Sequence, residues 1–160
     1  MANIFKQLEN KVARYRLNKG TLNQLKKRFG EFPYKATPTG ITGIIFLEKG
    51  VENKDLKLIG ELTGLRELCI LSNQISKIQG LDKLVNLGEL NLACNQISKI
   101  EGLSKLVNLQ VLNLAGNQIT KIEGLEKLNN LRELDLRKNN IPKLQIDKFK
   151  INNPKIKVYV

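Results

Sequence analysis

Histidine and tryptophan are absent from this 160-residue chain, and cysteine occurs only twice. Without histidine, the chain lacks the commonest general base, the commonest zinc ligand and every His-dependent nucleophile pair. Cys69 and Cys94 are too few for a disulfide framework or a Cys/His zinc site. Neither a GxxxxGK[ST] loop nor a GxGxxG turn occurs. We therefore expect no enzyme, no catalytic residues, no cofactor and no metal site.

Long apolar runs are missing as well. No run reaches about 18 residues, so we expect no membrane-spanning helix. The first ten residues contain Lys6 and Glu9 and no apolar core follows them, which does not resemble a signal peptide. Free thiols at Cys69 and Cys94 suit a reducing compartment. We expect a single-domain, monomeric, cytoplasmic protein.

What the chain does have is a 22-residue repeat between Leu65 and Leu144, with the frame LxxLxLxxNxIxxIxGLxxLxx. The copies LGELNLACNQISKIEGLSKLVN from Leu87 and LQVLNLAGNQITKIEGLEKLNN from Leu109 are nearly identical. A fixed period of about 20 to 50 residues indicates a solenoid, in which only neighbouring coils can cover each other's apolar interior.

Each repeat predicts its own local structure. The alternation in Leu90-Asn91-Leu92 predicts a short strand with both leucines inward and Asn91 outward. Apolar residues then return every three positions, which suits a 3₁₀ or extended path; they are Ile97, Ile100, Leu103, Leu106 and Leu109. One asparagine per repeat falls between core positions, where its buried amide must bond to backbone. We expect a structural ladder of Asn73, Asn95, Asn117 and Asn139.

This frame resembles the leucine-rich repeat family, in particular the 22-residue class known from a regulatory subunit of protein phosphatase 1 and from bacterial internalins. The resemblance implies an α/β fold: a right-handed solenoid with about six short parallel strands on its concave face and a 3₁₀ or extended convex side. Extracellular members of the family usually carry cysteine-rich caps, and this sequence has none.

The repeat degrades towards both ends. Ile44-Ile45-Phe46 fits the strand frame of the next repeat at a spacing of 24, with Lys49 in place of the ladder asparagine. Ile156-Lys157-Val158 follows Leu134 to Leu136 at a spacing of 22 and predicts a sixth strand. Before it, Asn153-Pro154 should prevent a helix from continuing.

Residues 1–40 lack the repeat and predict a helical N-terminal cap. A stripe from Ile4 to Tyr15 predicts one helix, which Asn18-Lys19-Gly20 should end. A second helix should begin at Thr21 as its N-cap and end at Gly30, and residues 33–40 should form a turn-rich connector. We thus expect residues 1–40 as cap and connector and residues 41–160 as the solenoid, in one structural unit. The alternative is a separate, partner-binding helical hairpin.

Charge is uneven along the chain. The formal net charge is +12, and residues 1–40 contribute +7 of it, nine Lys or Arg less Glu9 and Glu31. A basic end, including Lys26-Lys27-Arg28, can attract nucleic acid or an anionic membrane surface, or can simply favour a helix C-terminus. Lysines also recur at the repeat period, at Lys77, Lys99, Lys121 and Lys143 and at Lys83, Lys105 and Lys127. Nearby acids and the lack of interleaved aromatics favour solvated convex lysines over a phosphate track.

The outward strand positions are the candidate site, because the fold holds these side chains rigidly without using them. We predict a non-enzymatic module that binds another protein there. The alternatives are a weak nucleic-acid-binding or membrane-surface module and a purely structural, consensus-like repeat protein. Leu47, Leu71, Ala93 and Ala115 should form an apolar strip, and the acidic column beside it should face solvent without a pocket. The predicted partner-binding residues are Leu47, Glu67, Leu71, Glu89, Asn91, Val111, Asn113, Glu133, Asp135 and Arg137.

Overall fold

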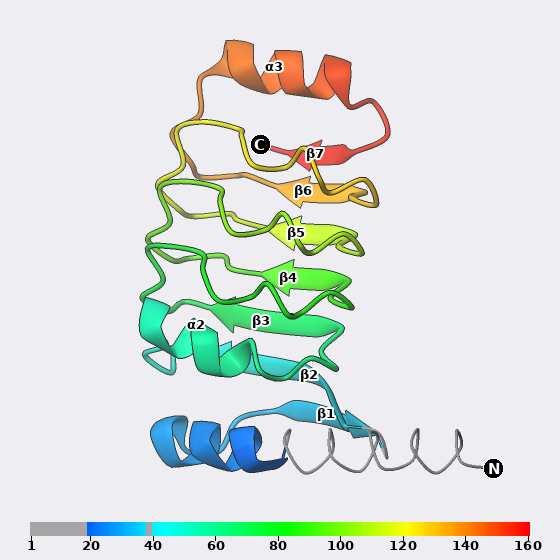
Figure 1. The fold of residues 1–160 in the computed structure, drawn as a ribbon. Helices are drawn as coiled ribbons and strands as arrows, with labels where there is room; N and C mark the ends of the chain where they lie inside the picture. The colour runs from blue at the N-terminus through cyan, green and yellow to red at the C-terminus, as the bar shows by residue number, and fades with distance from the viewer. Residues whose placement is uncertain (1–18, 38–39) are drawn as a thin grey trace, which may run out of the picture.

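The computed structural model describes residues 19–37 and 40–160. Within them, seven strands form one sheet in sequence order, with β2 to β7 parallel and β1 antiparallel to β2 (Figure 1). The strands are β1 (Tyr34–Thr37), β2 (Gly40–Leu47), β3 (Glu67–Leu71), β4 (Glu89–Asn91), β5 (Val111–Asn113), β6 (Glu133–Asp135) and β7 (Lys157–Tyr159). The predicted α/β solenoid, with six parallel strands, is confirmed.

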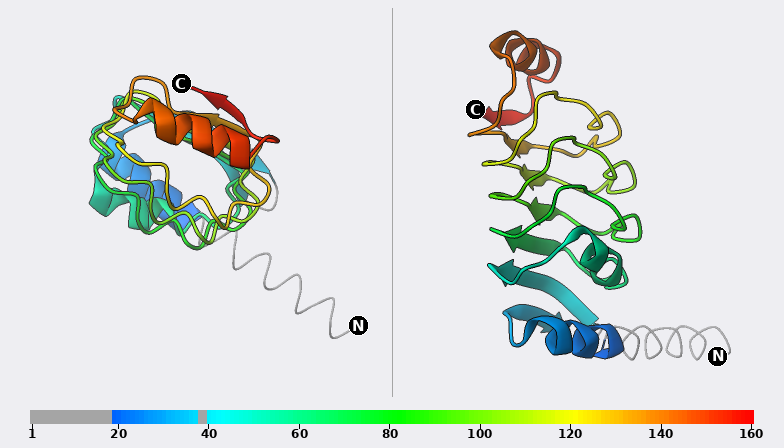
Figure 2. Two further views of the ribbon diagram at one scale, coloured as in Figure 1. Left: turned by 90° about the horizontal axis from the view of Figure 1, so that it is seen from above. Right: turned by 90° about the vertical axis from the view of Figure 1, so that its left-hand side faces the viewer.

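Seen from above, the coils superimpose as an oval with the sheet along one side (Figure 2). The inward leucines of each coil form one continuous core; Leu90, Leu92, Leu112 and Leu114 are at most 1% exposed. On the return path, the amides of Leu84 and Leu87 donate to the carbonyls of Leu81 and Leu84, both at 2.9 Å. These bonds span three residues, which confirms the 3₁₀-type convex side.

Helices occur in the two end coils, where the repeat did not predict them. They are α2 (Asn53–Ile59) and α3 (Lys143–Asn152). The pairing of Ile44 with Leu68 and of Leu134 with Val158 gives both coils 24 residues, two more than a regular repeat, and the extra length accommodates a helical return. As expected, α3 ends before Pro154. In the described ranges, no helix is both long and apolar enough for a membrane span.

The same pairing corrects the predicted register of the last strand. Leu134 lies opposite Val158 rather than Ile156, so the spacing is 24 instead of 22. The slip is an even number, so Val158 still points inward. The repeat period failed here because α3 replaces the leucine frame that sets it.

The asparagine ladder has the predicted geometry. The amide nitrogen of Asn95 donates to the carbonyls of Ile70 and Leu92 at 2.7 and 3.0 Å, and its oxygen accepts the Ile75 amide at 3.0 Å. Each ladder side chain therefore joins its own turn to the preceding coil. In the first coil, which lacks a ladder asparagine, the amides of Lys49 and Val51 both donate to Asn73.

A second asparagine row, in the turns just before β4, β5 and β6, was not predicted. Asn108 and Asn130 donate to the carbonyls of Val85 and Val107, each at 2.8 Å, and Asn86 reaches Thr63 at 3.4 Å. These three asparagines recur at the repeat period, so the signal was present in the sequence. Both rows bind coil to coil.

The N-terminal end of the solenoid is closed by a helix over residues 19–29 (Figure 1). Its predicted stripe of Leu22, Leu25 and Phe29 is buried, and the Phe29 ring packs edge-on against Phe46 at 5.3 Å. Arg28 also contacts the buried carboxylate of Asp55 in α2, at 3.3 Å. Gly30, with φ +70°, ends the helix as predicted.

Two predictions about this end are wrong. Lys19 and Gly20 are already helical, and Thr21 is buried inside the helix instead of capping it. A glycine inside a helix costs only about 1 kcal/mol, which the burial of Leu25 outweighs. Tyr34–Thr37 is strand β1 rather than part of a connector. The helix predicted over Ile4 to Tyr15, together with Asn18, lies outside the described residues.

Candidate functional site

The outward side chains of β2 to β6 form rows across the sheet, because the parallel register sets equivalent residues directly opposite one another. Nine of the ten predicted site residues belong to β2 to β6, and Arg137 follows the end of β6 by two residues. The first row, which we call the acidic row, is Gly43, Glu67, Glu89, Val111 and Glu133; the second, the amide row, is Ile45, Cys69, Asn91, Asn113 and Asp135.

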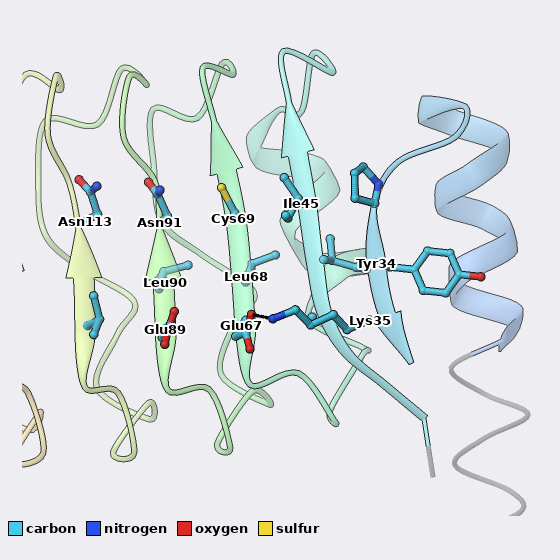
Figure 3. Close-up of a pocket in the computed structure, with 14 residues that line it drawn as sticks. Tyr34, Lys35, Ile45, Glu67, Leu68, Cys69, Glu89, Leu90, Asn91 and Asn113 are labelled. Atoms are coloured by element: carbon cyan, nitrogen blue, oxygen red, sulfur yellow. Dashed lines mark hydrogen bonds and ion pairs between the residues drawn. The ribbon is translucent and has the colours of Figure 1, made fainter. Parts of the chain in front are cut away.

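A groove of about 410 Å³ lies on this face between β1 and β5. Figure 3 shows its lining residues: the acidic and amide rows from β2 to β5 form the floor, and β1 forms one wall. The expectation that a flat strand face would offer no pocket is therefore wrong. The reason is β1, which the sequence did not predict and which contributes Pro33, Tyr34 and Lys35 to the lining.

Lys35 reaches across β2 to the carboxylate of Glu67 on β3 (Figure 3). Its path passes over Gly43, where an added Cβ would lie 3.2 Å from the Lys35 Cδ. Glycine at this position therefore leaves room for the lysine stem. The sequence carries no signal that Lys35 belongs to the site, since no pattern within the repeat relates it to Glu67, 32 residues away.

Among the described residues, the acidic row has one carboxylate that makes neither an ion pair nor a hydrogen bond. Glu67 pairs with Lys35, and Glu133 accepts a hydrogen bond from the Tyr159 hydroxyl at 3.3 Å. Glu89 is exposed and has no hydrogen bond or ion pair with any residue in the described part of the chain. It lies directly opposite Glu67.

The amide row presents nitrogen donors. The side-chain oxygens of Asn91 and Asn113 accept the backbone amides of Ala93 and Ala115, both at 3.0 Å. This bond turns each oxygen towards its own strand. Both amide nitrogens are left without a hydrogen bond to the described residues, next to the groove that Asn91 and Asn113 line.

Asp135 does not face solvent as predicted. The residue is 8% exposed, and Arg137 holds its carboxylate with a 2.6 Å contact. The same guanidinium lowers the pKa of Asp135 through this hydrogen bond, while the carboxylate raises the pKa of Arg137. The pair closes the far end of the amide row.

The predicted apolar strip is interrupted. Leu47 is 51% exposed and Leu71 is partly exposed, but Ala93 is only 6% exposed. The exposed apolar side chains of this region belong to β1 and β2, where Tyr34 is 40%, Ile45 43% and Leu47 51% exposed. Cys69 lies next to Ile45 and is half-buried, and this burial raises the pKa of its thiol.

The basic N-terminal cluster is largely engaged within the protein. Lys26 pairs with Glu31 at 2.9 Å, and Arg28 is held by Asp55. Two of the seven lysines in the repeat rows also have acidic partners among the described residues: Lys83 contacts Glu61 at 2.7 Å and Lys77 contacts Glu101 at 3.7 Å. These contacts favour a structural role over a phosphate track. Across residues 19–37 and 40–160, no cluster of three metal-ligating side chains occurs.

The chain is similar in sequence to a known repeat family. Residues 55–105 and 107–150, more than half of the chain, match the family model described as Leucine Rich repeats (2 copies). No curated protein matches the chain.

Several solved structures share the fold. An internalin (InlF) from Listeria monocytogenes is 34% identical, with a TM-score of 0.57, over 66% of this chain and 31% of that one. Internalin C2 from the same bacterium is 27% identical, with a TM-score of 0.63, over 75% and 50%. The receptor in a TLR13–ssRNA13 complex is 32% identical, with a TM-score of 0.53, over 64% and 16%. This chain thus spans between about a third and a half of the two internalins.

Proposed function

The chain belongs to the leucine-rich repeat family, whose domains are generally protein-interaction modules, and from that premise we propose that it binds another protein in the groove of its concave face. The observation that carries this proposal is the groove itself. The parallel register fixes the side chains that line the groove, yet several of them belong neither to the core nor to the asparagine ladder. Ile45 and Glu89 are exposed. The amide nitrogens of Asn91 and Asn113 make no hydrogen bond to the described residues.

Rigidity supports binding at this face. A partner pays little ordering entropy for side chains that a sheet already holds in place. Exposed apolar side chains next to polar groups are also the usual composition of a recognition surface. The proposed partner-binding residues are those predicted except the buried Asp135, together with Lys35 and Ile45 from the groove wall and floor.

The remaining parts of the proposal concern context. We propose a monomeric, non-enzymatic protein whose N-terminal segment caps the solenoid of residues 41–160, with β1 (Tyr34–Thr37) joined to its sheet. The two free cysteines, Cys69 half-buried and Cys94 exposed, support a reducing compartment such as the cytoplasm. Nucleic-acid or membrane binding through the N-terminal region has less support, because Lys26 and Arg28 are engaged in ion pairs.

Site-specific photocrosslinking tests this function. A photoreactive residue replaces Val111 in the groove, and a matched variant carries it at Val107, which is 46% exposed and does not line the groove. Both variants are exposed to lysate of the source cells at low and physiological salt. We expect the Val111 variant to capture one protein at both salt concentrations. Equal capture by the Val107 variant, or capture of nucleic acid alone, would contradict the proposal.

A further inference from the structure

We infer that the groove recognises an extended peptide segment that presents a lysine or arginine side chain, whose cationic head binds between Glu67 and Glu89. This inference rests on the proposed protein-binding function and specifies the chemistry of the partner. It follows from the charges, the hydrogen-bonding groups and the shape of the groove.

Two carboxylates share one internal cation in the acidic row. Glu67 and Glu89 lie directly opposite each other on neighbouring parallel strands, which run about 4.8 Å apart. Like charges at such positions repel, so the pair favours a cation between them. Lys35 supplies one positive charge from the side of Glu67, and this corner of the groove keeps a net charge of −1. A positively charged partner group would cancel it.

Lys35 leaves access to the carboxylates. Its side chain is 64% exposed and that of Glu67 is 45% exposed. Solvent-exposed ion pairs of this kind contribute about 0 to 1 kcal/mol. A guanidinium or ammonium from a partner can therefore join Glu89 beside the existing pair, or displace Lys35 from Glu67, at small cost.

The amide row fits the backbone of such a segment. The free amide nitrogens of Asn91 and Asn113 lie on adjacent strands, so both can donate to backbone carbonyl oxygens of a chain that crosses the strands. Figure 3 shows these two side chains in one row, with Cys69 and Ile45 continuing it towards β1. Ile45, Cys69 and Pro33 form an apolar corner there, which suits an aliphatic side chain of the same segment.

The contrast with the whole molecule strengthens the inference. The chain has a formal net charge of +12, and a protein this basic repels cationic partners at long range. Within the groove, however, Glu67 and Glu89 outnumber the cation Lys35. Selection for a basic segment must therefore arise from direct contacts in the groove, so changes confined to these residues should alter it.

The test uses pools of short acetylated and amidated peptides with random uncharged flanks and one fixed central residue: arginine, its neutral isostere citrulline, norleucine or glutamate. Binding of fluorescent pools to the full chain is measured by anisotropy at low salt. We expect the arginine pool to bind at least about tenfold more tightly than the citrulline pool. Glu89→Gln should remove most of that preference. Lys35→Met, which frees Glu67 while keeping an apolar stem, should increase it.

Control variants separate this inference from the function on which it rests. Glu123→Gln removes an exposed carboxylate outside the groove and should leave the preference unchanged. Val111→Arg places a competing cation in the groove and should abolish it. Equal binding of the arginine and citrulline pools overturns the inference. An arginine preference that survives Glu89→Gln also overturns the inference. In that case, loss of peptide binding in Val111→Arg would still support protein binding in the groove. Unchanged peptide binding in Val111→Arg would contradict the proposed function as well.

Discussion

At the scale of single residues, the solenoid depends on side chains that join one coil to the next rather than on the leucines alone. The amide of Asn95 is buried and bonds to backbone groups of two coils. The glycines of the convex turns lie where coils approach closely, so a side chain there meets the neighbouring backbone. Such positions tolerate little change, and their substitution should reveal the register of the fold.

Asn95→Ala should lower the free energy of unfolding by about 2 to 3 kcal/mol, because it leaves buried backbone groups such as the Ile70 carbonyl and the Ile75 amide without partners. The neighbouring Gln96 is exposed, so Gln96→Ala should be nearly neutral. Urea denaturation measures both. Equal losses for the two variants would show that the ladder does not hold the turns.

Gly102→Ala tests close approach separately from backbone conformation. Gly102 has φ +69°, and an added Cβ would lie 2.3 Å from the Ile78 carbonyl oxygen. Gly50 has nearly the same φ, +68°, with no atom within 4 Å of such a Cβ. Gly50→Ala should therefore cost only the left-handed backbone penalty of about 1 to 2 kcal/mol, and Gly102→Ala clearly more. Equal shifts in the urea midpoint would exclude a steric contribution.

The ion pair of Asp135 and Arg137 predicts a pH dependence. Because Arg137 lowers the pKa of Asp135 in the folded chain, the pair stabilises the fold at pH values above the ordinary aspartate pKa of about 3.9. That stabilisation is lost as pH falls below this value, through the lower folded pKa. Asp135→Asn keeps the oxygen that accepts the Arg137 amide and should remove this part of the acid dependence. Parallel stability profiles of both proteins from neutral to acidic pH would contradict this assignment.

At the scale of elements, the two ends of the solenoid differ. The helix over residues 19–29 buries its apolar stripe, whereas α3 has no buried residue. The N-terminal helix should therefore stabilise the stack much more than α3 does.

A pair of leucines tests this difference. Leu25 is fully buried and Leu144 in α3 is 67% exposed. Leu25→Ala should cost about 2 to 5 kcal/mol by leaving a cavity between helix and first coil. Leu144→Ala should change the free energy of unfolding by less than about 0.5 kcal/mol. Thermal or urea unfolding gives both values, and a larger loss for Leu144→Ala would reverse the assignment of the two ends.

The sequence predicts the elements of the regular coils but not those of the end coils. The period of 22 residues places Leu90, Asn91 and Asn95 correctly, because every coil repeats the same contacts. It carries no information where the frame is replaced: α2 and α3 occupy longer coils, and the period placed Ile156 where Val158 pairs. β1 escaped prediction because Pro33 and Pro38 favour a turn-rich reading of the segment between them, whereas its pairing with β2 depends on a partner strand.

For the candidate site, the sequence predicts positions but not environments. Alternation places Glu67, Glu89 and Asp135 on one face, as the structure has them. It does not reveal that Lys35 crosses Gly43 to reach Glu67, or that Arg137 covers Asp135. Both contacts depend on side-chain packing across strands, which one-dimensional periodicity does not encode.

At the scale of the whole molecule, a basic solenoid presents a groove with an excess of carboxylates on its concave face, while its lysine rows lie on the convex side. A protein partner in the groove and a phosphate-bearing partner on the lysine rows would therefore contact opposite sides of the molecule. Substitutions on the two sides should separate these modes of binding without disturbing the shared core.

The most direct measurement is the affinity of the captured partner for two variants by isothermal titration calorimetry, alongside their melting temperatures. Val111→Arg should weaken binding at least tenfold, about 1.4 kcal/mol, because the added side chain occupies the groove and its charge competes for Glu89 on the neighbouring strand. Leu71→Arg on the same face should act in the same direction. Lys99→Glu on the convex side should leave the affinity unchanged, and melting temperatures should stay nearly constant throughout. Normal binding by the two concave variants, with binding abolished by Lys99→Glu, would place the site on the lysine rows and contradict the account.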